Sequence, residues 1–302
     1  MSIYADKLQR FDRTSILGWS NTRFDTFGQC KRKYFYQYYG KHDVEHDLRK
    51  INLLKELTTV PLEVGNISHK VIQRLLKRLQ KTDAPINLEQ FYSYVEQETL
   101  AICSQKNFEE IHYKKRDSID FKLEVFPLVS KAMDNFLQSD RMQWLLEEAL
   151  AYKDDWLIEF GDDYYGECRI DDLKSYCKVD FMFPIEDELH ILDWKTGKEH
   201  YAKYSTQLHG YAGWANFHFG KEYSKIKTTI AYLLPEYKEK SVEITEFHID
   251  DFTEHVRSQT DEMYKYCSEP EFNIPLAKDV FKMTPVVNFC KYCKFRELCD
   301  RE

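Results

Sequence analysis

The chain of 302 residues lacks any apolar run close to the roughly 20 residues that a membrane-spanning helix needs. Its first 15 residues contain no apolar segment of the kind found in secretory signals. We find no low-complexity segment, no internal repeat and no Walker A pattern. We therefore expect a soluble, cytoplasmic protein that makes no membrane contact, and any helicase would be a separate partner.

The sequence also lacks an excess of positive charge, with 43 Lys and Arg against 51 Asp and Glu and a net charge of −8. This argues against a general nucleic-acid coat protein, which is usually basic. It does not exclude a nucleic-acid enzyme, because carboxylates that bind metal count as negative and the cation cancels part of their charge. Basic runs do occur, and each alone is most simply a solvated face: Lys31–Lys33; Lys70, Arg74, Lys77, Arg78 and Lys81; Lys114–Arg116.

The order of patterns predicts one α/β domain: a mixed sheet flanked by helices, with a helical insertion before it. We divide it into an N-terminal segment (1–40), a helical subdomain (41–150), the α/β core (151–269) and a C-terminal cysteine knuckle (270–302). Apolar spacing predicts helices over Val64–Leu79, Phe91–Ile102, Leu123–Leu150, Tyr204–Phe219 and Phe252–Cys267. Short runs of β-formers predict strands over Trp156–Phe160, Tyr164–Ile170, Cys177–Phe183, Leu189–Trp194, Lys227–Leu234 and Val242–His248.

The strongest local signal is the run from Ile191 to Gly197, which reads Ile-Leu-Asp-Trp-Lys-Thr-Gly. Residues two apart on a strand point to the same face, so Asp193 and Lys195 project together. The carboxylate suits a hard cation such as Mg²⁺ or Mn²⁺. The lysine suits orienting or deprotonating a water, or stabilising charge on a phosphate. A D-x-K taken alone is more often a surface ion pair, so a second carboxylate decides the matter.

Asp180 supplies that second carboxylate on the preceding predicted strand, which a short turn at 184–188 joins to the Asp193 strand. Two adjacent antiparallel strands bring both carboxylates to one cation. Asp171 and Asp172 are competing candidates, but their segment does not run directly into the Asp193 strand. His209 and His218, on the helix that follows, are interpreted as non-ligands.

The order of these motifs resembles the RecB-like branch of the PD-(D/E)xK nucleases, which includes the iron-sulfur exonucleases associated with CRISPR systems. Besides Asp180 and Asp193-Trp194-Lys195, the chain has a Gly-x-x-x-His pattern ending at His69 and a Gln-x-x-x-Tyr pattern over Gln207–Tyr211. The resemblance covers an N-terminal motif near residue 20, the helix at 65–79 and most of 164–299. The stretch 82–150 matches no motif.

This resemblance implies a restriction-endonuclease-like fold and a role for each matched residue. His69, Asp180, Asp193 and the main-chain carbonyl of Trp194 would bind one or two Mg²⁺ or Mn²⁺ ions, and Lys195 would be the catalytic lysine. Gln207 and Tyr211 would face the nucleic acid or support Lys195. For His69, Gln207 and Tyr211 individually, a place in the core or on a packed helix face is the simpler interpretation, and their order favours function.

Three of the eight cysteines cluster as Cys290, Cys293 and Cys299. A C-x2-C pair directs two sulfurs to one ion or cluster, and a third cysteine nearby leaves one ligand position open. Cys30, in a segment that resembles the family's N-terminal motif, fills that position with Lys31 replacing the usual proline. The resemblance then implies a four-thiolate [4Fe-4S] site in a lobe that joins both chain ends; spacing alone allows Zn²⁺ equally. The other four cysteines are expected to be buried and unliganded: Cys103, Cys168, Cys177 and Cys267.

Basic and aromatic residues interleave after Cys30. Lys31, Arg32 and Lys33 suit phosphate contacts, and the rings of Tyr34, Phe35, Tyr36, Tyr38 and Tyr39 suit stacking on unpaired bases. For most of these rings, a place in the core is the stronger interpretation.

We therefore expect a metal-dependent deoxyribonuclease, an exonuclease favouring single-stranded or free DNA ends, in repair, recombination, or phage- or CRISPR-related processing. One alternative is a non-catalytic iron-sulfur DNA-binding subunit of a nuclease-helicase or adaptation complex. Another is a zinc-stabilised interaction module, which would leave Asp180 and Asp193 without a role.

Overall fold

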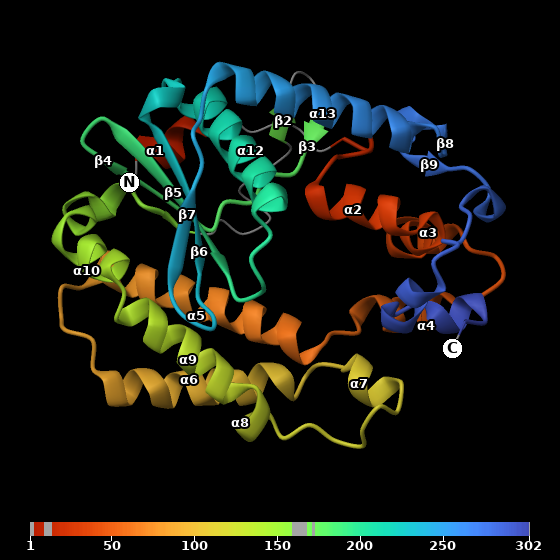
Figure 1. The fold of residues 1–302 in the computed structure, drawn as a ribbon, viewed down its shortest axis with the longest axis horizontal. Coiled ribbons are helices and arrows are strands. Elements are labelled where there is room, and N and C mark those ends of the chain that lie inside the picture. Colours follow the sequence, from red (N-terminus) through yellow and green to blue (C-terminus); the bar gives the residue numbers. More distant parts are fainter. Residues whose placement is uncertain (1–2, 9–13, 159–167, 171–172, 302) are drawn as a thin grey trace.

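A computed structural model describes residues 3–8, 14–158, 168–170 and 173–301 (Figure 1). Its centre is a five-stranded mixed sheet in the order β1-β4-β5-β6-β7, in which β5 is antiparallel to β4 and parallel to β6. The predicted mixed α/β core is therefore confirmed. The sheet strands are β1 (Leu157–Ile158), β4 (Phe181–Ile185), β5 (Glu188–Lys195), β6 (Ile226–Tyr232) and β7 (Lys238–Ser241). Two small hairpins pair β2 (Cys168–Ile170) with β3 (Leu173–Ser175) and β8 (Cys267–Glu269) with β9 (Ile274–Pro275).

Helices cover both faces of this sheet, and the alternation of side chains along β5 explains why. Leu192 and Trp194 join the core formed with α5 (Val60–Lys81) and α9 (Phe126–Leu137). Leu189 and Ile191 join the opposite core, formed with α12 (Tyr201–Phe219). Because successive strand residues point to opposite faces, Asp193 and Lys195 lie on the α12 side. A further helix, α13 (Glu246–Tyr264), packs against α12 (Figure 1).

Of the three helices predicted before the sheet, two are present in the structure. The helices over Val64–Leu79 and Phe91–Ile102 are present with longer ends, as α5 and as α6 (Leu88–Cys103), and Thr59 and Asn87 cap their N-termini. The single helix predicted over Leu123–Leu150 is wrong. The chain restarts at α9, whose first turn contains Pro127, and again at α10 (Asp140–Glu147), which Ser139 caps. The segment also contains α4 (Leu48–Glu56), α7 (Glu109–His112) and α8 (Phe121–Glu124).

Two strand predictions need correction, and two lie partly outside the described residues. The predicted strand Val242–His248 is wrong: β7 ends at Ser241, and the Thr245 hydroxyl accepts from the His248 N–H to begin α13. The strand predicted over Cys177–Phe183 begins only at Phe181. Residues 159–160 and 164–167 of the predicted Trp156–Phe160 and Tyr164–Ile170 strands lie outside the described part.

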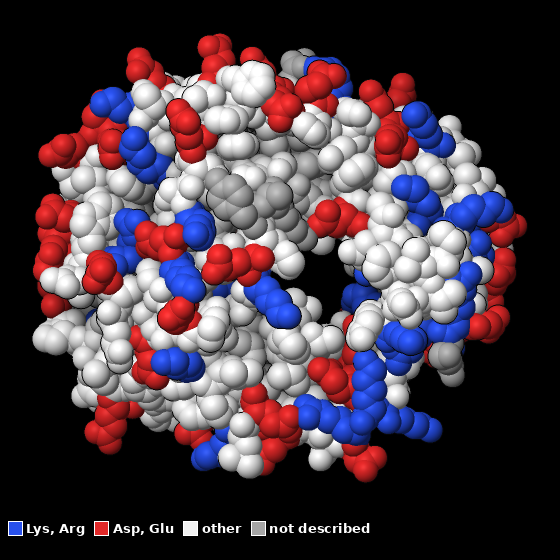
Figure 2. All heavy atoms as spheres, viewed as in Figure 1, with Lys and Arg blue, Asp and Glu red and all other residues white. Residues whose placement is uncertain are grey.

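Two segments far apart in the chain meet in one lobe, which we call the terminal lobe: α2 (Asn21–Gln29) with α3 (Lys31–Tyr39), and residues 278–299. The N-terminus itself lies across the molecule, beside the sheet (Figure 1). The Tyr36 hydroxyl donates to the Leu298 carbonyl at 3.0 Å. On its other side, the lobe contacts the helical segment: the Tyr113 hydroxyl donates to the Lys294 carbonyl, and the Lys294 ammonium to the Lys55 carbonyl, both at 2.7 Å. These contacts close a ring, and Figure 2 shows the opening that it surrounds.

Within the described ranges, no helix has the length and apolar character required to cross a membrane.

His190 gives the fold a pH dependence. Its ring stacks on Phe183 at 5.4 Å between centroids and packs against Trp144. Burial lowers the pKa of His190 to about 4. The unfolded chain takes up this proton near pH 6.5, so the stabilisation is complete above that pH and is lost as the pH falls towards 4. Between these two limits, the contribution of His190 to the free energy of unfolding changes by roughly 3 kcal/mol.

Urea unfolding at pH 7 and pH 4.5 tests this contribution. The free energy of unfolding should fall less between the two pH values in His190→Gln than in wild type. The exposed His255→Gln is the control, and equal pH effects in all three proteins would contradict the assignment.

Candidate active site

Asp180 and Asp193 lie side by side because a tight turn joins their strands. Asp180 immediately precedes β4, and Phe181 is paired with Leu192 of β5. The Trp194 N–H donates to Asp180 Oδ2 at 3.0 Å, which fixes the first carboxylate against the strand that carries the second. The predicted pairing of two carboxylates on adjacent antiparallel segments is present in the structure.

Asp193 is almost completely buried, at 2% exposure, and each of its oxygens has different neighbours. Oδ2 forms an ion pair with Lys195. Oδ1 accepts from Gln207 Nε2 at 3.0 Å and lies 2.7 Å from the Tyr211 hydroxyl, which also contacts the Lys178 carbonyl at 2.8 Å. Gln207 and Tyr211 are one turn apart on α12, so one helix face holds the carboxylate. Both residues contact Asp193, which in turn forms the ion pair with Lys195.

His69 reaches the same place from α5. Its Nδ1 lies 3.2 Å from Asp180 Oδ2. One turn earlier, Gly65 lets the helix approach the loop after β5: a Cβ at this position would meet Thr196 Oγ1 at 3.1 Å. In the Gly-x-x-x-His pattern, the glycine thus allows α5 to approach the loop after β5, and the histidine contacts Asp180 one turn later.

The charges of these residues act strongly on one another. Burial raises the pKa of Asp193, and the negative charge of Asp180 raises it further. Burial opposes ionisation of Asp180 too, but the charge and hydrogen bond of His69 hold its pKa below the usual value. Burial disfavours the charged Lys195, yet the Asp193 carboxylate raises the pKa of the lysine. Two neighbouring carboxylates in one buried site therefore compete for a limited supply of positive charge.

The site opens into a cavity of about 550 Å³. Several lining residues were not recognised from the sequence, among them Lys178 and Thr196, which flank the acidic residues. Tyr204 was also missed; its ring centroid lies 5.3 Å from Lys195 Nζ. The spacing of Tyr204, Gln207 and Tyr211 along one helix face was the available signal. The cavity is lined by Pro61, Leu62, Gly65, Asn66, His69, Lys70, Gln73, Lys178, Asp180, Trp194, Lys195, Thr196 and Gly197.

The other Asp and His residues considered from the sequence lie away from the two carboxylates or outside the described residues, and the other cysteines differ in burial. Asp171 and Asp172 lie outside the described residues. His209 stacks on His248 with centroids 4.8 Å apart, and His218 is buried beside Trp214; neither contacts the two carboxylates. Cys103 and Cys267 are buried as expected, Cys177 is partly exposed, and the Cys168 side chain is outside the described part.

Most rings after Cys30 belong to the core, as the stronger interpretation had it: Tyr34, Phe35, Tyr36 and Tyr39 are at most 2% exposed. Among the basic residues, Lys31 Nζ lies 3.1 Å from the Phe27 ring centroid. Arg32 Nε donates to the Phe281 carbonyl at 2.9 Å, and Lys33 Nζ donates to Gln29 at 3.2 Å. Arg32 thus attaches the C-terminal segment to α3.

The four cysteines predicted to share one site, Cys30, Cys290, Cys293 and Cys299, all belong to segments of the terminal lobe. Cys30 Sγ accepts from the Thr284 N–H at 3.4 Å, which brings the N-terminal thiol to the C-terminal segment. Burial raises the pKa of Cys299 to about 12, and the charges of Cys293, Cys30 and Cys290 add to this rise. Burial likewise raises the pKa of Cys293, and a bound cation would favour the ionised form of both thiols.

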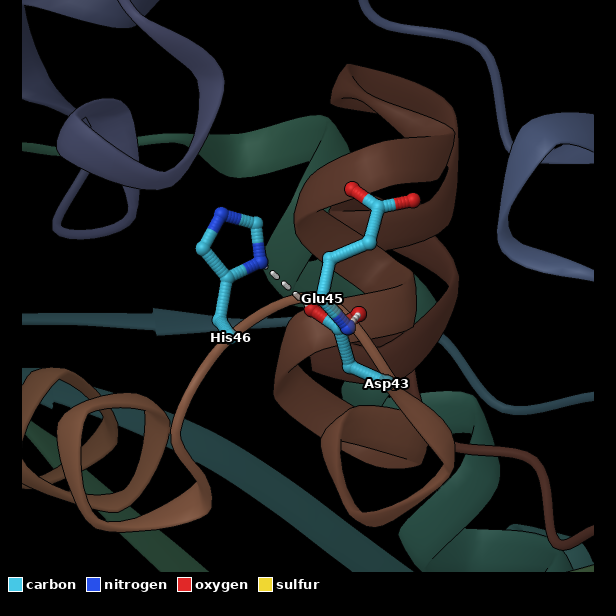
Figure 3. A group of neighbouring side chains, drawn as sticks. All are labelled: Asp43, Glu45 and His46. Carbon is cyan, nitrogen blue, oxygen red and sulfur yellow. Dashed lines mark hydrogen bonds and ion pairs between the residues drawn. The ribbon is translucent and has the colours of Figure 1, made fainter.

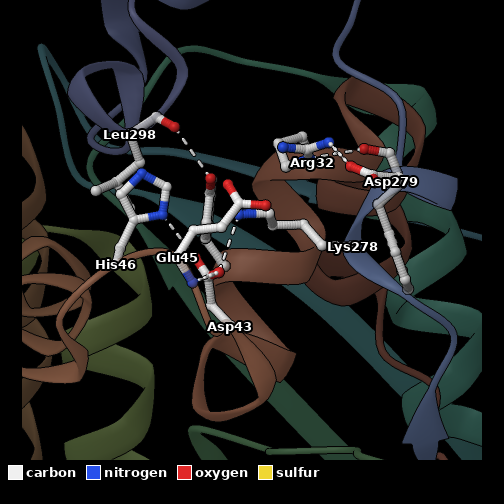
Figure 4. Close-up of polar contacts among 9 residues, drawn as sticks. Arg32, Asp43, Glu45, His46, Lys278, Asp279 and Leu298 are labelled. Atoms are coloured by element: carbon white, nitrogen blue, oxygen red, sulfur yellow. Dashed lines mark hydrogen bonds and ion pairs between the residues drawn. The ribbon is translucent and has the colours of Figure 1, made fainter.

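A separate acidic group lies in the loop after α3, and the sequence did not single it out. Asp43, Glu45 and His46 have ligand atoms within 4.8 Å of one another, and among the described residues they are the one such group of three (Figure 3). His46 Nδ1 lies 2.7 Å from Asp43 Oδ2. The Lys278 ammonium lies 2.9 Å from Asp43 Oδ1 and also contacts Glu45 (Figure 4). The Lys278 ammonium thus occupies the place that a metal ion would take between these carboxylates, and the ion pairs join this loop to the C-terminal segment.

Comparison with known proteins decides the family. The model of the PD-(D/E)XK nuclease superfamily matches residues 18–300. The chain belongs to this superfamily. No curated protein matches it. A solved structure described as the crystal structure of SSO0001 aligns with 89% of this chain and 94% of its own, at 11% identity and a TM-score of 0.29.

As a member of the PD-(D/E)XK superfamily, the protein is a nuclease by family, and such nucleases act on DNA and usually use divalent metal ions. The residues present fit such an ion. Asp193 Oδ2 is buried and has no hydrogen-bond partner among the described residues, apart from its ion pair with Lys195. Two carboxylates and one imidazole are suitable donors for Mg²⁺ or Mn²⁺.

The contacts of Tyr211 predict that its hydroxyl positions Asp193. Tyr211→Phe keeps the buried ring but removes one hydrogen bond to a carboxylate, which should weaken Mn²⁺ binding about 10-fold. Isothermal titration with Mn²⁺ measures this change. Tyr223→Phe, on a partly buried ring outside the site, is the matched control. An unchanged Mn²⁺ affinity in a folded Tyr211→Phe protein would contradict the positioning role.

Proposed function

We propose that this nuclease hydrolyses phosphodiester bonds in DNA with Mg²⁺ or Mn²⁺, and that it acts as an exonuclease on single-stranded or free ends. The observation that carries the proposal is that Asp180 and Lys195 line one open cavity, and that Lys195 forms an ion pair there with the buried Asp193. An ion held by His69, Asp180, Asp193 and the Trp194 carbonyl would polarise the phosphate and activate the attacking water.

The protein's own residues supply the rest of the reaction. The Lys195 ammonium, fixed by Asp193, orients the attacking water and stabilises negative charge on a phosphate oxygen. The water oxygen forms a bond to phosphorus while the bond from phosphorus to the leaving sugar oxygen breaks. That oxygen takes up a proton, and the water loses one. Gln207 and Tyr211 keep the Asp193 carboxylate from rotating during these steps.

The ring shape supports action at ends. The cavity with Asp180 and Lys195 opens between α5 and the loop after β5, and the terminal lobe closes the ring on the far side (Figures 1 and 2). A strand that passes through a closed ring must enter by an end. A single strand is narrower than a duplex and exposes its bases, so it is the form that such a passage favours. Lys31, Arg32 and Lys33 would attract its phosphates from the terminal lobe.

We further propose that the chain belongs to the RecB-like branch and holds a [4Fe-4S] cluster on Cys30, Cys290, Cys293 and Cys299. Four sulfurs bound to one zinc ion at about 2.3 Å would lie about 3.8 Å apart. No three of these sulfurs form a group within 4.8 Å in the described structure. A four-iron cluster spaces its thiolates more widely, because each binds a different iron at a corner of a cube. The preference for iron-sulfur over Zn²⁺ rests on the resemblance of the cysteine pattern to that of the RecB-like branch.

The competing function is a non-catalytic DNA-binding subunit that works in the cytoplasm with a helicase or a CRISPR adaptation partner. The ion pair of Lys195 with Asp193 argues against the non-catalytic alternative, because a site without catalytic activity does not need a lysine beside a buried carboxylate. DNA repair, recombination and phage- or CRISPR-related processing remain the settings for the proposed nuclease.

Cleavage of end-labelled single- and double-stranded DNA tests the catalytic proposal. Anaerobically purified wild type should release nucleotides from single-stranded ends with Mg²⁺ or Mn²⁺ and not with EDTA. Asp193→Asn and Lys195→Ala should each lower the rate by at least about 100-fold, because each removes a group used in the transition state. Asp250→Asn, on an exposed face of α13, is the charge-matched control. Wild type that is folded and inactive on every substrate would favour the non-catalytic alternative.

The cluster proposal has a separate readout. Anaerobic wild type should contain about four irons per chain and absorb visible light, and Cys299→Ala should lose both the iron and part of its thermal stability. Cys103→Ala, a buried cysteine in the helical segment, should keep the iron. One zinc per chain without iron would replace the proposed cluster by a zinc site. A protein that contains neither iron nor zinc would overturn both assignments.

A further inference from the structure

A second cavity of about 240 Å³ adjoins the active site on the far side of Lys178. Lys178 lines both cavities. Gln207 and Tyr211, which hold Asp193, also form part of the second cavity's wall. A strand with its phosphate at the carboxylates would therefore have its neighbouring nucleotide beside this second cavity. The lining comprises Trp19, Ser20, Asn21, Thr22, Ser175, Tyr176, Cys177, Lys178, Gln207, Gly210, Tyr211 and Phe252.

The walls of this cavity are held firmly by backbone contacts. The Trp19 N–H donates to the Lys174 carbonyl and the Tyr176 N–H to the Trp19 carbonyl, both at 2.8 Å. The Trp19 ring packs edge-on against Phe252 at 5.5 Å, and its Nε1 donates to Gln259 at 2.8 Å. Trp19 and Phe252 therefore give the cavity one aromatic side that is packed and hydrogen-bonded in place.

Ser175 is the polar group that this wall leaves unused. Its side chain is 1% exposed, and its Oγ has no hydrogen-bond partner among the described residues. An unpartnered buried hydroxyl is costly, because its hydrogen bonds to water are lost on folding. A hydroxyl can both donate and accept, so it suits the polar edge of a ligand inside the cavity.

The charge of the lining also limits the ligand. None of the lining residues is acidic, although the chain has 51 Asp and Glu. The lining also includes Asn21 and Thr22, the first two residues of α2, and a helix N-terminus favours anions. Aromatic walls, a buried hydroxyl and an anion-friendly rim together match a nucleotide.

We propose that this cavity binds one unpaired nucleobase of the DNA strand, that of the nucleotide next to the scissile phosphate. The proposal rests on the nuclease function proposed above and adds a base-binding subsite to it. Tyr176 contributes stacking from the rim, where its ring packs against Gly18: a Cβ at Gly18 would lie 2.3 Å from that ring. Ser175 Oγ hydrogen-bonds the edge of the base. A base in a duplex cannot enter, so the subsite favours single strands.

Abasic substitution tests the proposal. A set of single-stranded oligonucleotides carries one abasic site at successive positions, with binding measured in EDTA and cleavage measured with Mn²⁺. In wild type, one position next to the cleaved bond should weaken binding and kcat/KM about 10-fold, as loss of one stacked base does. Tyr176→Ala should bind intact and abasic strands nearly equally. Phe247→Ala removes an exposed aromatic outside the cavity and should behave as wild type.

Ser175→Ala gives a second, gentler variant. It removes a hydroxyl with no protein partner, so the melting temperature should not fall. The spread of kcat/KM among strands that differ only in that one base should shrink several-fold. An unchanged spread together with a lowered melting temperature would assign Ser175 a structural role and remove it from the proposal.

The two proposals fail in different ways. Cleavage that no abasic position affects would overturn the base subsite and leave the nuclease intact. Binding that depends on one position and on Tyr176, without cleavage in Mn²⁺, would support the subsite and overturn the nuclease. Neither binding nor cleavage of single strands would overturn both.

Discussion

The structure depends on accommodating one carboxylate, that of Asp193, in a buried place. Asp193 is 2% exposed, and an isolated charge there would be strongly unfavourable. Lys195 on the same strand face and the Gln207 and Tyr211 donors on α12 offset that cost. The register of β5, the docking of α12 and the position of Asp180 all follow from satisfying this one group. A shift of β5 by one residue would turn Asp193 to the apolar face formed with α5 and α9.

The terminal lobe imposes a second constraint, because segments about 250 residues apart must meet there. Buried polar contacts fix that meeting: Arg32 on the Phe281 carbonyl, Lys278 on Asp43 and the Tyr36 hydroxyl on the Leu298 carbonyl. These contacts assemble the framework of the lobe, whose segments carry the four cysteines proposed to share one site. A metal or cluster there would act on a lobe that is already shaped, and its removal should loosen the ring more than the sheet.

The sequence predicted what depends on local pattern and missed what depends on distant packing. Asp180, Asp193 and Lys195 could be placed because strand alternation and a short turn leave little freedom. The break at Pro127 and the start of α13 at Thr245 were misjudged, because a cap or a restart outweighs apolar spacing. The second cavity was not foreseen, since Trp19, Ser175 and Phe252 come from three distant segments. No periodicity in the chain reports such a meeting.

The distribution of charge around the two cavities resolves the conflict between an acidic chain and an anionic substrate. Two of the acidic residues, Asp180 and Asp193, lie side by side where a bound cation would neutralise them. The adjoining cavity has no acidic lining residue and includes Lys178 at its boundary with the first. A net charge of −8 therefore says little about the path of a strand, because the screened charges beyond about 10 Å contribute weakly there. The approach of a phosphate depends on the charges that lie side by side there: the acidic site with its cation, then Lys178, then a cavity without acidic residues.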